Sequence, residues 1–324
     1  MPKDHAYQES DFLLDDDEPV RLARVPDDLL DSSLDLDAVS HEFTPRQVRL
    51  LQLARLALGQ LASQLPKDIK LPLFLAGPEQ LIEGDQPINK AFIEHLAGQS
   101  GVALDLATSR IISTGRAGSL AAVDLAFRLF AGSEDRFAIV GGVDTYCDPT
   151  VLEYLLQNDR LLVGKNLDGF IPGEGAAFLL LARQPAPLYP GAARPVSLSE
   201  VGLASEPGHR GSAEPYRGDG LAQACASALA RAAAPKIQTL YSSMNGEHFF
   251  IKEHGVAMIR NSEYLADNLK VEHPADSFGD LGAAFGPVAI GLTAVHVLNG
   301  KLRPPCLVCC SSDKDARAAV VVQC

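Results

Sequence analysis

The chain has 324 residues, 47% of them hydrophobic, and a formal net charge of −13 at pH 7. This length is enough for a large core and suggests two domains or one duplicated unit. The negative charge argues against nucleic acid or an anionic membrane as the main partner, because both select basic surfaces. No run of about 18 apolar residues and no apolar leader occurs. We therefore expect a cytoplasmic protein that contacts neither nucleic acid nor membrane.

The first half begins with an acidic stretch. Residues 1–40 are predicted to be a solvated segment with one short strand at 20–25. Thr44 and Pro45 are typical of the start of a helix, and leucines at helical spacing follow them. The further predicted elements are a strand at 71–77, a helix at 89–97, a short strand before residue 113, a helix from Ala117, a strand at 137–144, and a glycine-rich turn and strand within 169–181.

A proline-rich connection at 184–195 is the best internal boundary, so the predicted units are 1–40, 41–190 and 191–324. The second half is predicted to contain strands at 196–203, 239–243, 306–310 and 316–322, and helices at 221–233, 247–265 and 281–298. Both halves place a helix of small residues after a glycine-containing elbow, at 118–126 and 282–290. This repetition favours a duplicated α/β fold whose two central helices lie between sheets.

The stretch from Ile111 to Glu174 carries the most specific pattern: a strand, a tight turn and a helix, then a buried strand ending in glycines, then Gly-Phe-Ile-Pro-Gly-Glu-Gly. It resembles the beta-ketoacyl synthases of the thiolase-like superfamily. The resemblance covers about residues 40–324 and implies a thiolase-like fold with duplicated α/β halves in alternating αβαβα layers. In that family the elbow presents a cysteine at a helix N-terminus, where the helix dipole stabilises a thiolate. Here Arg116 occupies that place, and no sulfur can carry the acyl group.

The other catalytic positions implied by the resemblance also differ. Asn245 stands where the family has its first histidine, and Gly279 where it has the second. The family's lysine falls on Pro274, and the closing glycine loop is replaced by residues 310–315. The homology class is thus an acyltransferase, a 3-oxoacyl-carrier-protein synthase, with its Cys-His-His condensing triad missing. The resemblance implies a pseudoenzyme that forms a homodimer and uses no cofactor.

Three short stretches carry a narrower resemblance. Residues 244–247, 273–276 and 278–286 resemble the divergent thiolase-like proteins encoded in bacterial type VI secretion effector clusters. That resemblance implies an accessory role in effector loading, with a secretion effector or an adaptor as partner. Two other interpretations remain: an acyltransferase that uses a different nucleophile, and a non-catalytic partner subunit of a synthase, of the chain-length-factor type.

Four polar residues are predicted to converge where the acyl pocket of the family lies: Arg116, Asn245, Glu247 and Asp280. A buried arginine needs carboxylate partners, so this cluster could be an ion-pair network that fills a vacated pocket. It could equally be a repurposed active site, or a binding site for a small ligand or a peptide end.

Two further expectations concern metals and sheet edges. Cys306, Cys309 and Cys310 lack a second ligand pair at zinc spacing, so we expect a buried strand and no metal there. The apolar strand 137–143 is the predicted edge for homodimer pairing. The family also begins with an apolar strand for which there is no room before Asp11. Either that strand is dispensable here or it has been lost from the start of the sequence, and a missing strand would leave another sheet edge exposed.

Overall fold

The structure, a computed structural model, describes residues 6–14, 17–30, 43–65, 69–183, 196–232 and 235–323. The proline-rich connection at 184–195 lies outside these ranges. None of the described helices is both long enough and apolar enough to cross a membrane.

Helices and strands alternate along most of the chain, as in an α/β fold. The main helices are α2 (Pro45–Leu61), α3 (Lys90–Gln99), α4 (Gly115–Gly132), α5 (Pro149–Gln157), α6 (Asp219–Ala232), α7 (His248–Arg260), α8 (Ala275–Phe278) and α9 (Phe285–Leu298). The strands are β1 (Gln8–Leu13), β2 (Pro19–Leu22), β3 (Leu73–Ala76), β4 (Arg110–Ile112), β5 (Phe137–Thr145), β6 (Glu174–Ala182), β7 (Ser197–Leu198), β8 (Gly202–Ser205), β9 (Ile237–Ser242), β10 (Leu265–Glu272), β11 (Cys306–Ser311) and β12 (Ala316–Gln323).

The first sheet has the strand order β4-β3-β5-β6. Its first three strands are parallel to one another, and β6 is antiparallel to β5. Strand β5 is therefore paired on both sides, and the prediction that residues 137–143 form a sheet edge is wrong. An apolar run fits an interior strand, because both of its faces are covered. The strands at the ends of this order are β4 and β6.

The second sheet repeats this pattern and adds to it. Its order is β10-β9-β11-β12, with β7 and β8 both paired to β12. Strands β9, β10 and β11 are parallel, and β12 is antiparallel to β11. Each sheet thus has three parallel strands followed by one antiparallel strand. In the second sheet a further segment, β7 and β8, lies beside the antiparallel strand.

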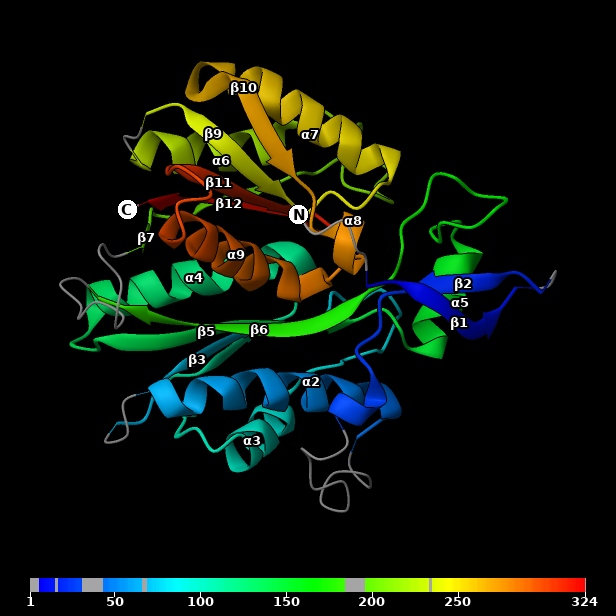
Figure 1. The fold of residues 1–324 in the computed structure, drawn as a ribbon, viewed down its shortest axis with the longest axis horizontal. Coiled ribbons are helices and arrows are strands. Elements are labelled where there is room, and N and C mark those ends of the chain that lie inside the picture. Colours follow the sequence, from blue (N-terminus) through cyan, green and yellow to red (C-terminus); the bar gives the residue numbers. More distant parts are fainter. Residues whose placement is uncertain are drawn as a thin grey trace.

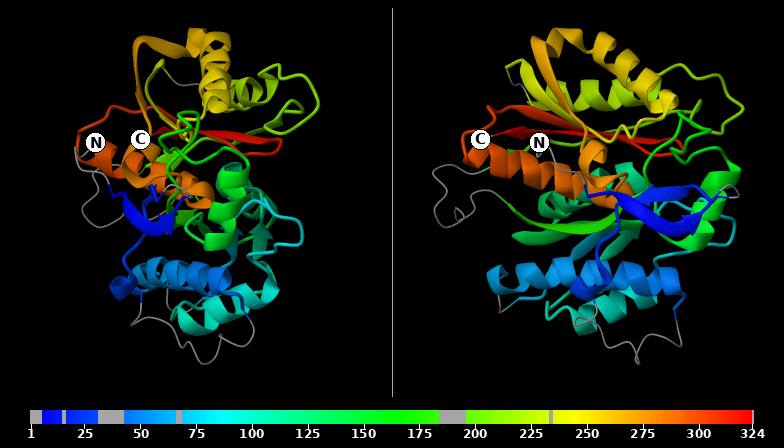
Figure 2. Two further views of the ribbon diagram at one scale, coloured as in Figure 1. Left: turned by 90° about the vertical axis from the view of Figure 1, so that its right-hand side faces the viewer. Right: turned by 45° about the vertical axis from the view of Figure 1, so that its right-hand side comes forward.

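The two sheets enclose a central layer made of α4 and α9, with α2 and α3 outside the first sheet and α6 and α7 outside the second (Figures 1 and 2). Small residues let the two central helices approach closely. A Cβ on Gly286 of α9 would lie 2.1 Å from the hydroxyl of Ser119 on α4. One core cluster includes residues of α4, α9 and both sheets. The predicted duplicated α/β fold in alternating layers is confirmed.

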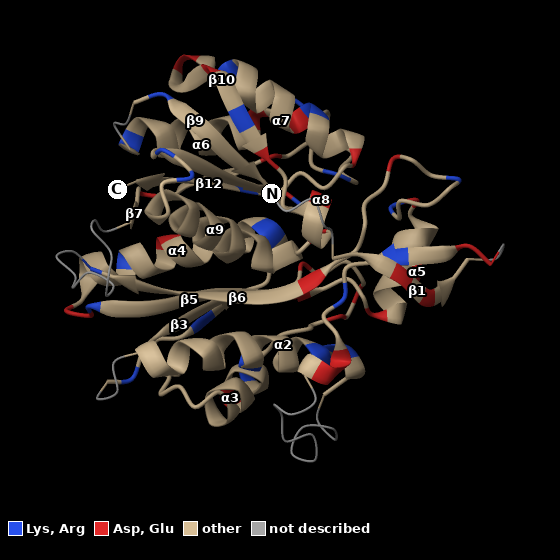
Figure 3. Cartoon of the chain, viewed as in Figure 1, with Lys and Arg blue, Asp and Glu red and all other residues tan. Residues whose placement is uncertain are grey.

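The N-terminal segment is more ordered than its acidity predicts. Strands β1 and β2 pair antiparallel and form the N-terminal hairpin. Val20 and Leu22 are buried in a cluster with α5, whereas Glu9 and Asp11 are exposed, and Figure 3 shows the charges along this hairpin. Strand β2 overlaps the strand predicted at 20–25 and ends at Leu22, whereas β1 lies in what was predicted to be a solvated segment. Alternation of apolar and polar side chains, rather than net charge, determines the strand.

Helix α5 and strand β10 are missing from the sequence-based prediction. Asp148 caps α5 by accepting hydrogen bonds from the backbone of Thr150 and Val151, and Pro149 follows it. The helix predicted at 247–265 ends at Arg260. Asn261 ends it by donating to the carbonyls of Ala257 and Ala222, and β10 then begins at Leu265.

Candidate functional site

The elbow between β4 and α4 positions Arg116 as the second residue of α4. Gly115 opens the helix with φ +61°, a conformation that favours glycine. Ser312 fixes the elbow from the opposite half, since its hydroxyl accepts from the Ala117 backbone at 3.0 Å and donates to the Thr114 carbonyl. The side chain of Arg116 is only 2% exposed. The position therefore lies in the interior, between the two halves.

Arg116 binds two carboxylates. Its Nε lies 3.0 Å from each Asp280 oxygen, one Nη also contacts Asp280, and the other Nη donates to Asp313 at 2.9 Å. The guanidinium also lies 5.1 Å from the centre of the Phe250 ring. A cation is disfavoured at a helix N-terminus by the helix dipole. Asp280 and Asp313 offset that penalty.

Asn245 and Glu247 join the same cluster. The Asn245 amide donates to Asp280 at 2.8 Å and to Glu247 at 3.1 Å, and its carbonyl oxygen accepts from the Glu247 backbone. The structure thus brings together all four residues that the sequence places in the old acyl pocket. Glu247, however, does not contact Arg116. Its partner is a second arginine.

Arg160, which sequence reasoning missed, completes the network. It donates to both Glu247 oxygens, at 2.9 and 2.7 Å, and to both Asp313 oxygens, at 2.6 and 3.1 Å. Arg160 is as buried as Arg116. Glu247 also contacts Arg210, which is partly exposed. Asp313, in the segment that replaces the family's glycine loop, therefore bridges two buried arginines.

The ionisation of the network follows from these pairs. Burial alone would raise the pKa of Asp313, but Arg160 and Arg116 hold it well below its usual range. Burial alone would lower the pKa of Arg116, and the charge of Asp280 reverses this, so the guanidinium stays charged. Glu79 accepts from the backbone of Asp313 and Lys314, and burial together with the Asp313 charge raises its pKa. The arginines of the cluster are thus paired with its carboxylates, and their hydrogen bonds are made within the cluster.

Gly279 stands between α8 and the loop to α9, with φ +65°. A Cβ there would lie 2.8 Å from the carbonyl oxygen of Ile171. No larger side chain fits this conformation and space without a backbone shift. Pro274, at the other position where the family has a catalytic residue, precedes α8.

The described cysteines are poor substitutes for the missing thiol. Hydrogen bonding from Cys225, together with His254, lowers the pKa of Cys309 to about 5, yet Cys309 is 1% exposed. Cys147 is more accessible, but burial raises the pKa of its thiol well above the usual value. Within the described residues, no group of three or more His, Cys, Asp or Glu side chains could hold a metal ion.

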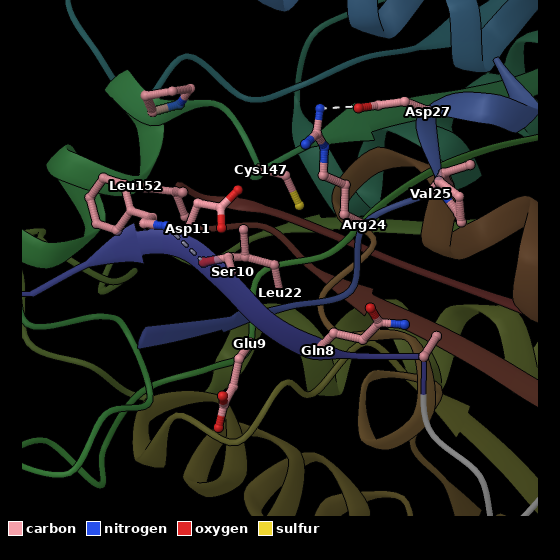
Figure 4. A pocket seen from close by; sticks show the side chains of 14 residues that line it. Gln8, Glu9, Ser10, Asp11, Leu22, Arg24, Val25, Asp27, Cys147 and Leu152 are labelled. Atoms are coloured by element: carbon pink, nitrogen blue, oxygen red, sulfur yellow. Dashed lines mark hydrogen bonds and ion pairs between the residues drawn. The ribbon is translucent and has the colours of Figure 1, made fainter. Parts of the chain in front are cut away.

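One cavity lies away from this network, beside the N-terminal hairpin (Figure 4). Its volume is about 520 Å³, and its lining includes Ser10, Leu22, Arg24, Cys147 and Leu152. Arg24 in this lining forms an ion pair with Asp27, with 3.1 Å between its Nη2 and the Asp27 Oδ1. The Cys147 thiol in this wall is protonated for the reason given above. The cavity therefore lacks an activated nucleophile.

Part of the first half of the chain is similar in sequence to a known family. Residues 76–186 match the family profile Beta-ketoacyl synthase, N-terminal domain. These residues include the elbow and strands β5 and β6. No curated protein sequence matches the chain.

Solved structures are similar over nearly the whole chain. The structure of AntDE:AntF (apo), a type II PKS acyl-carrier protein in complex with its ketosynthase bound to the hexaketide, gives a TM-score of 0.73 at 14% identity, covering 99% of this chain and 92% of the other. The ketosynthase ApeO with its chain length factor ApeC, from Xenorhabdus doucetiae, gives 0.70 at 17% identity, covering 98% and 90%. The ishigamide ketosynthase/chain length factor gives 0.68 at 14% identity, covering 99% and 92%.

The chain has a ketosynthase-like fold. At these identities the similarity establishes the thiolase-like architecture and leaves activity to be argued from the residues. Arg116, which belongs to the buried charge network, lies at the N-terminus of α4 and within the residues that match the family profile.

Proposed function

We propose that this protein is a non-catalytic, cytoplasmic binding protein that keeps the ketosynthase-like fold without condensing activity. The observation that carries the proposal is Arg116. It lies at the helix N-terminus where the resemblance places the nucleophile, and it is buried and paired with Asp280 and Asp313. Asn245 and Gly279 stand where the family has its histidines, so nothing there can stabilise a thioester oxyanion as those side chains do.

The burial of the network supports a structural role for it. Arg116, Arg160, Glu247, Asp280 and Asp313 are each less than one tenth exposed. Their charges are paired within the cluster, since each carboxylate contacts at least one guanidinium. A substrate could reach them only by breaking these pairs, which costs several kcal/mol.

The purified protein is expected to form no covalent acyl-enzyme. After incubation with acyl-CoA or an acylated carrier protein, intact-mass spectrometry should show the unmodified chain, because the described thiols are buried or protonated and Arg116 is no nucleophile. A stoichiometric acyl adduct that hydroxylamine removes would contradict the proposal and favour the rival interpretation, an acyltransferase with a different nucleophile.

The variant Arg116→Cys serves as the control for this test. It restores the missing sulfur but leaves Asn245 and Gly279 in place, so we expect no ketoacyl product. A ketoacyl product from this single variant would show that the remaining site is competent.

Two kinds of partner are consistent with a binding role. The narrower resemblance favours loading of a type VI secretion effector, directly or through an adaptor. The similarity to two ketosynthase and chain length factor structures favours the second candidate, a non-catalytic subunit of an active synthase. Affinity purification from the native organism followed by mass spectrometry separates them, since the first predicts secretion proteins and the second a ketosynthase. Recovery of neither would leave both without support.

We further propose that the protein is a homodimer paired through β4 rather than β5. Strand β4 is at the end of its sheet, and beside it lies a hollow of about 300 Å³ whose lining includes Leu106, Ile111 and Ile93. Antiparallel pairing of β4 with its copy would continue the sheet across a two-fold axis and cover this apolar surface.

Sedimentation equilibrium should accordingly give a dimer at micromolar concentration. Leu106, which is 44% exposed, provides the variant Leu106→Asp, which is expected to weaken the dimer at least about tenfold by burying a carboxylate in the interface. Ile251→Asp, at an equally exposed position on α7, is the matched control. A wild-type monomer, or equal effects of the two substitutions, would refute pairing through β4.

A further inference from the structure

Beyond an isolated bridge between Ala23 and Gly173 at its start, the outer edge of β6 has no strand partner among the described residues. Next to the two ends of β6, the Gly173 carbonyl accepts a hydrogen bond from the Tyr146 backbone, and the Arg183 backbone donates one to the Arg136 carbonyl, both on the β5 side. Because bonded and non-bonded pairs alternate along an antiparallel ladder, residues 175, 177, 179 and 181 also bond to β5. The N–H and C=O groups of residues 176, 178, 180 and 182 therefore point away from the sheet. Such a row is a template for another strand.

The second half of the chain shows what covers the equivalent edge. Helix α6, strand β9, helix α7 and strand β10 occur in the same order as α2, β3, α3 and β4, and the two sheets share one strand order. By this correspondence β6 is equivalent to β12. Strand β12 has β7 and β8 along its outer edge, running antiparallel to it. No described strand occupies the equivalent position beside β6.

The covering segment in the second half is apolar on both faces. Leu198 and Val201 pack into the central core with α4, and Ala204 packs against the core under α6. An occupant of the β6 edge would likewise lie between a central helix, α9, and an outer helix, α2. Both of these helices contact β6 (Figure 1).

Helix α9 has an outer surface that fits this role. The helix contains no Asp, Glu, Lys or Arg, whereas a helix at the surface of a protein normally has a charged face. Val288 and Leu292 are half-buried, and Val295 is 53% exposed. On β6 itself, Leu179 and Leu181 on one face and Leu180 on the other are also only partly covered. An uncharged helix face beside an unpaired strand edge is typical of an interface.

We propose that the β6 edge binds an extended segment of a partner protein, which adds to the first sheet as a fifth strand antiparallel to β6. The segment is apolar on both faces, as β7 and β8 are. The charged residue of 196–205, Glu200, lies between these two strands, and its side chain is 72% exposed. It would begin at the C-terminal end of β6, beside the exposed Arg183, whose side chain donates to the Ser133 carbonyl. An acidic residue at its start would complement that charge.

A free segment fits this edge better than the β6 of a second copy. In each copy the faces of β6 already pack against its own α2 and α9. The uncovered surface of α9 instead requires a strand whose own faces are uncovered. The inference does not depend on whether the buried charge network is catalytic, because β6 contributes none of the arginines or carboxylates of that network.

The test uses a synthetic peptide with the sequence of residues 196–205 and one aspartate added at its N-terminus, and hydrogen exchange of the full chain. In the free protein, amides 176, 178, 180 and 182 should exchange quickly, and amides 177, 179 and 181 slowly. Saturating peptide should slow the first set at least about tenfold and leave the second set unchanged, because only the first set faces the new strand. The same peptide with Leu198→Pro and Ala204→Pro should give no protection.

Val295→Lys should weaken peptide binding about tenfold, because it places a charge in the interface. Ile259→Lys on α7, which replaces a residue that is 76% exposed, is the matched control and should have no effect. Absence of peptide protection at millimolar concentration, or protection without alternation, would overturn the proposal. So would slow exchange of amides 176, 178, 180 and 182 in the free protein, because the edge would then be covered by the chain itself or by a second copy.

Discussion

Replacing Arg116 with alanine is expected to lower the free energy of unfolding by about 3 to 5 kcal/mol, because it leaves a buried carboxylate without its cation. Arg116 is the only cationic side chain within ion-pair distance of Asp280 in the described part of the chain. Asp313 remains paired with Arg160, so the loss of stability comes mainly from the unpaired Asp280. Chemical denaturation at pH 7 measures the effect directly.

Arg128→Ala provides the matched control for this prediction. Arg128 lies on the same helix, α4, but is 71% exposed and pairs with Asp124 at the surface. Its removal should change the free energy of unfolding by less than about 0.5 kcal/mol. If Arg116→Ala is as stable as this control but abolishes partner binding, the cluster is a functional site and not a structural filling. If it is stable and binds normally, neither role holds.

The variant Asp144→Asn is expected to stabilise the protein by about 4 kcal/mol at pH 8 and by less than half of that at pH 5, and the gain should vanish only below about pH 4. Burial raises the pKa of Asp144 to about 7, from a usual value of 3.8. Between those values the folded state keeps a proton that the unfolded state has released, so stability falls as the pH rises. A difference of about three pKa units corresponds to about 4 kcal/mol. Asparagine removes this penalty while keeping an oxygen that can accept from the Ala283 backbone.

Urea unfolding of wild type and variant at pH 5 and pH 8 tests this prediction. Asp267→Asn, at an exposed position of β10, should show no comparable pH-dependent gain. Arg46 provides the opposing effect, since one of its nitrogens lies 4.0 Å from Asp144. If Asp144→Asn destabilises the protein at pH 8, the folded state does not raise the pKa of Asp144, and the attraction of Arg46 outweighs the effect of burial.

Under the proposed function, the contacts describe the region of the family's active site converted into part of the core. The framework that positions the helix N-terminus is retained: the elbow with Gly115, the glycine at 279 and the small residues between α4 and α9. The side chains that meet there bind one another. This division agrees with a fold that outlasts a particular activity, since fold and site are specified by different residues.

The sequence alone was enough to predict the elements with strong local signals. Thr44 caps α2 in a capping box with Gln47, and such caps depend only on neighbouring residues. The small-residue helices and their glycine elbows likewise predicted the central layer. The four polar positions 116, 245, 247 and 280 could be placed together because a known fold supplied their relative positions.

Other features depended on contacts between distant residues. Arg160 follows α5 without any local pattern, and its partners Glu247 and Asp313 lie 87 and 153 positions away. The interior position of β5 depends on which strands flank it, and local hydrophobicity does not distinguish an interior strand from an edge that pairs with another molecule. Residues 265–272 have a mixed composition with no clear strand pattern, and they form β10 by pairing with β9. The sequence by itself thus determined most of the longer helices and the cap of α2, because these follow from local spacing, and its resemblance to a known family implied the fold class. Only the tertiary structure decided the strand order, the second buried arginine and the unpaired edge of β6, because each of these depends on the packing of segments that are far apart in the chain.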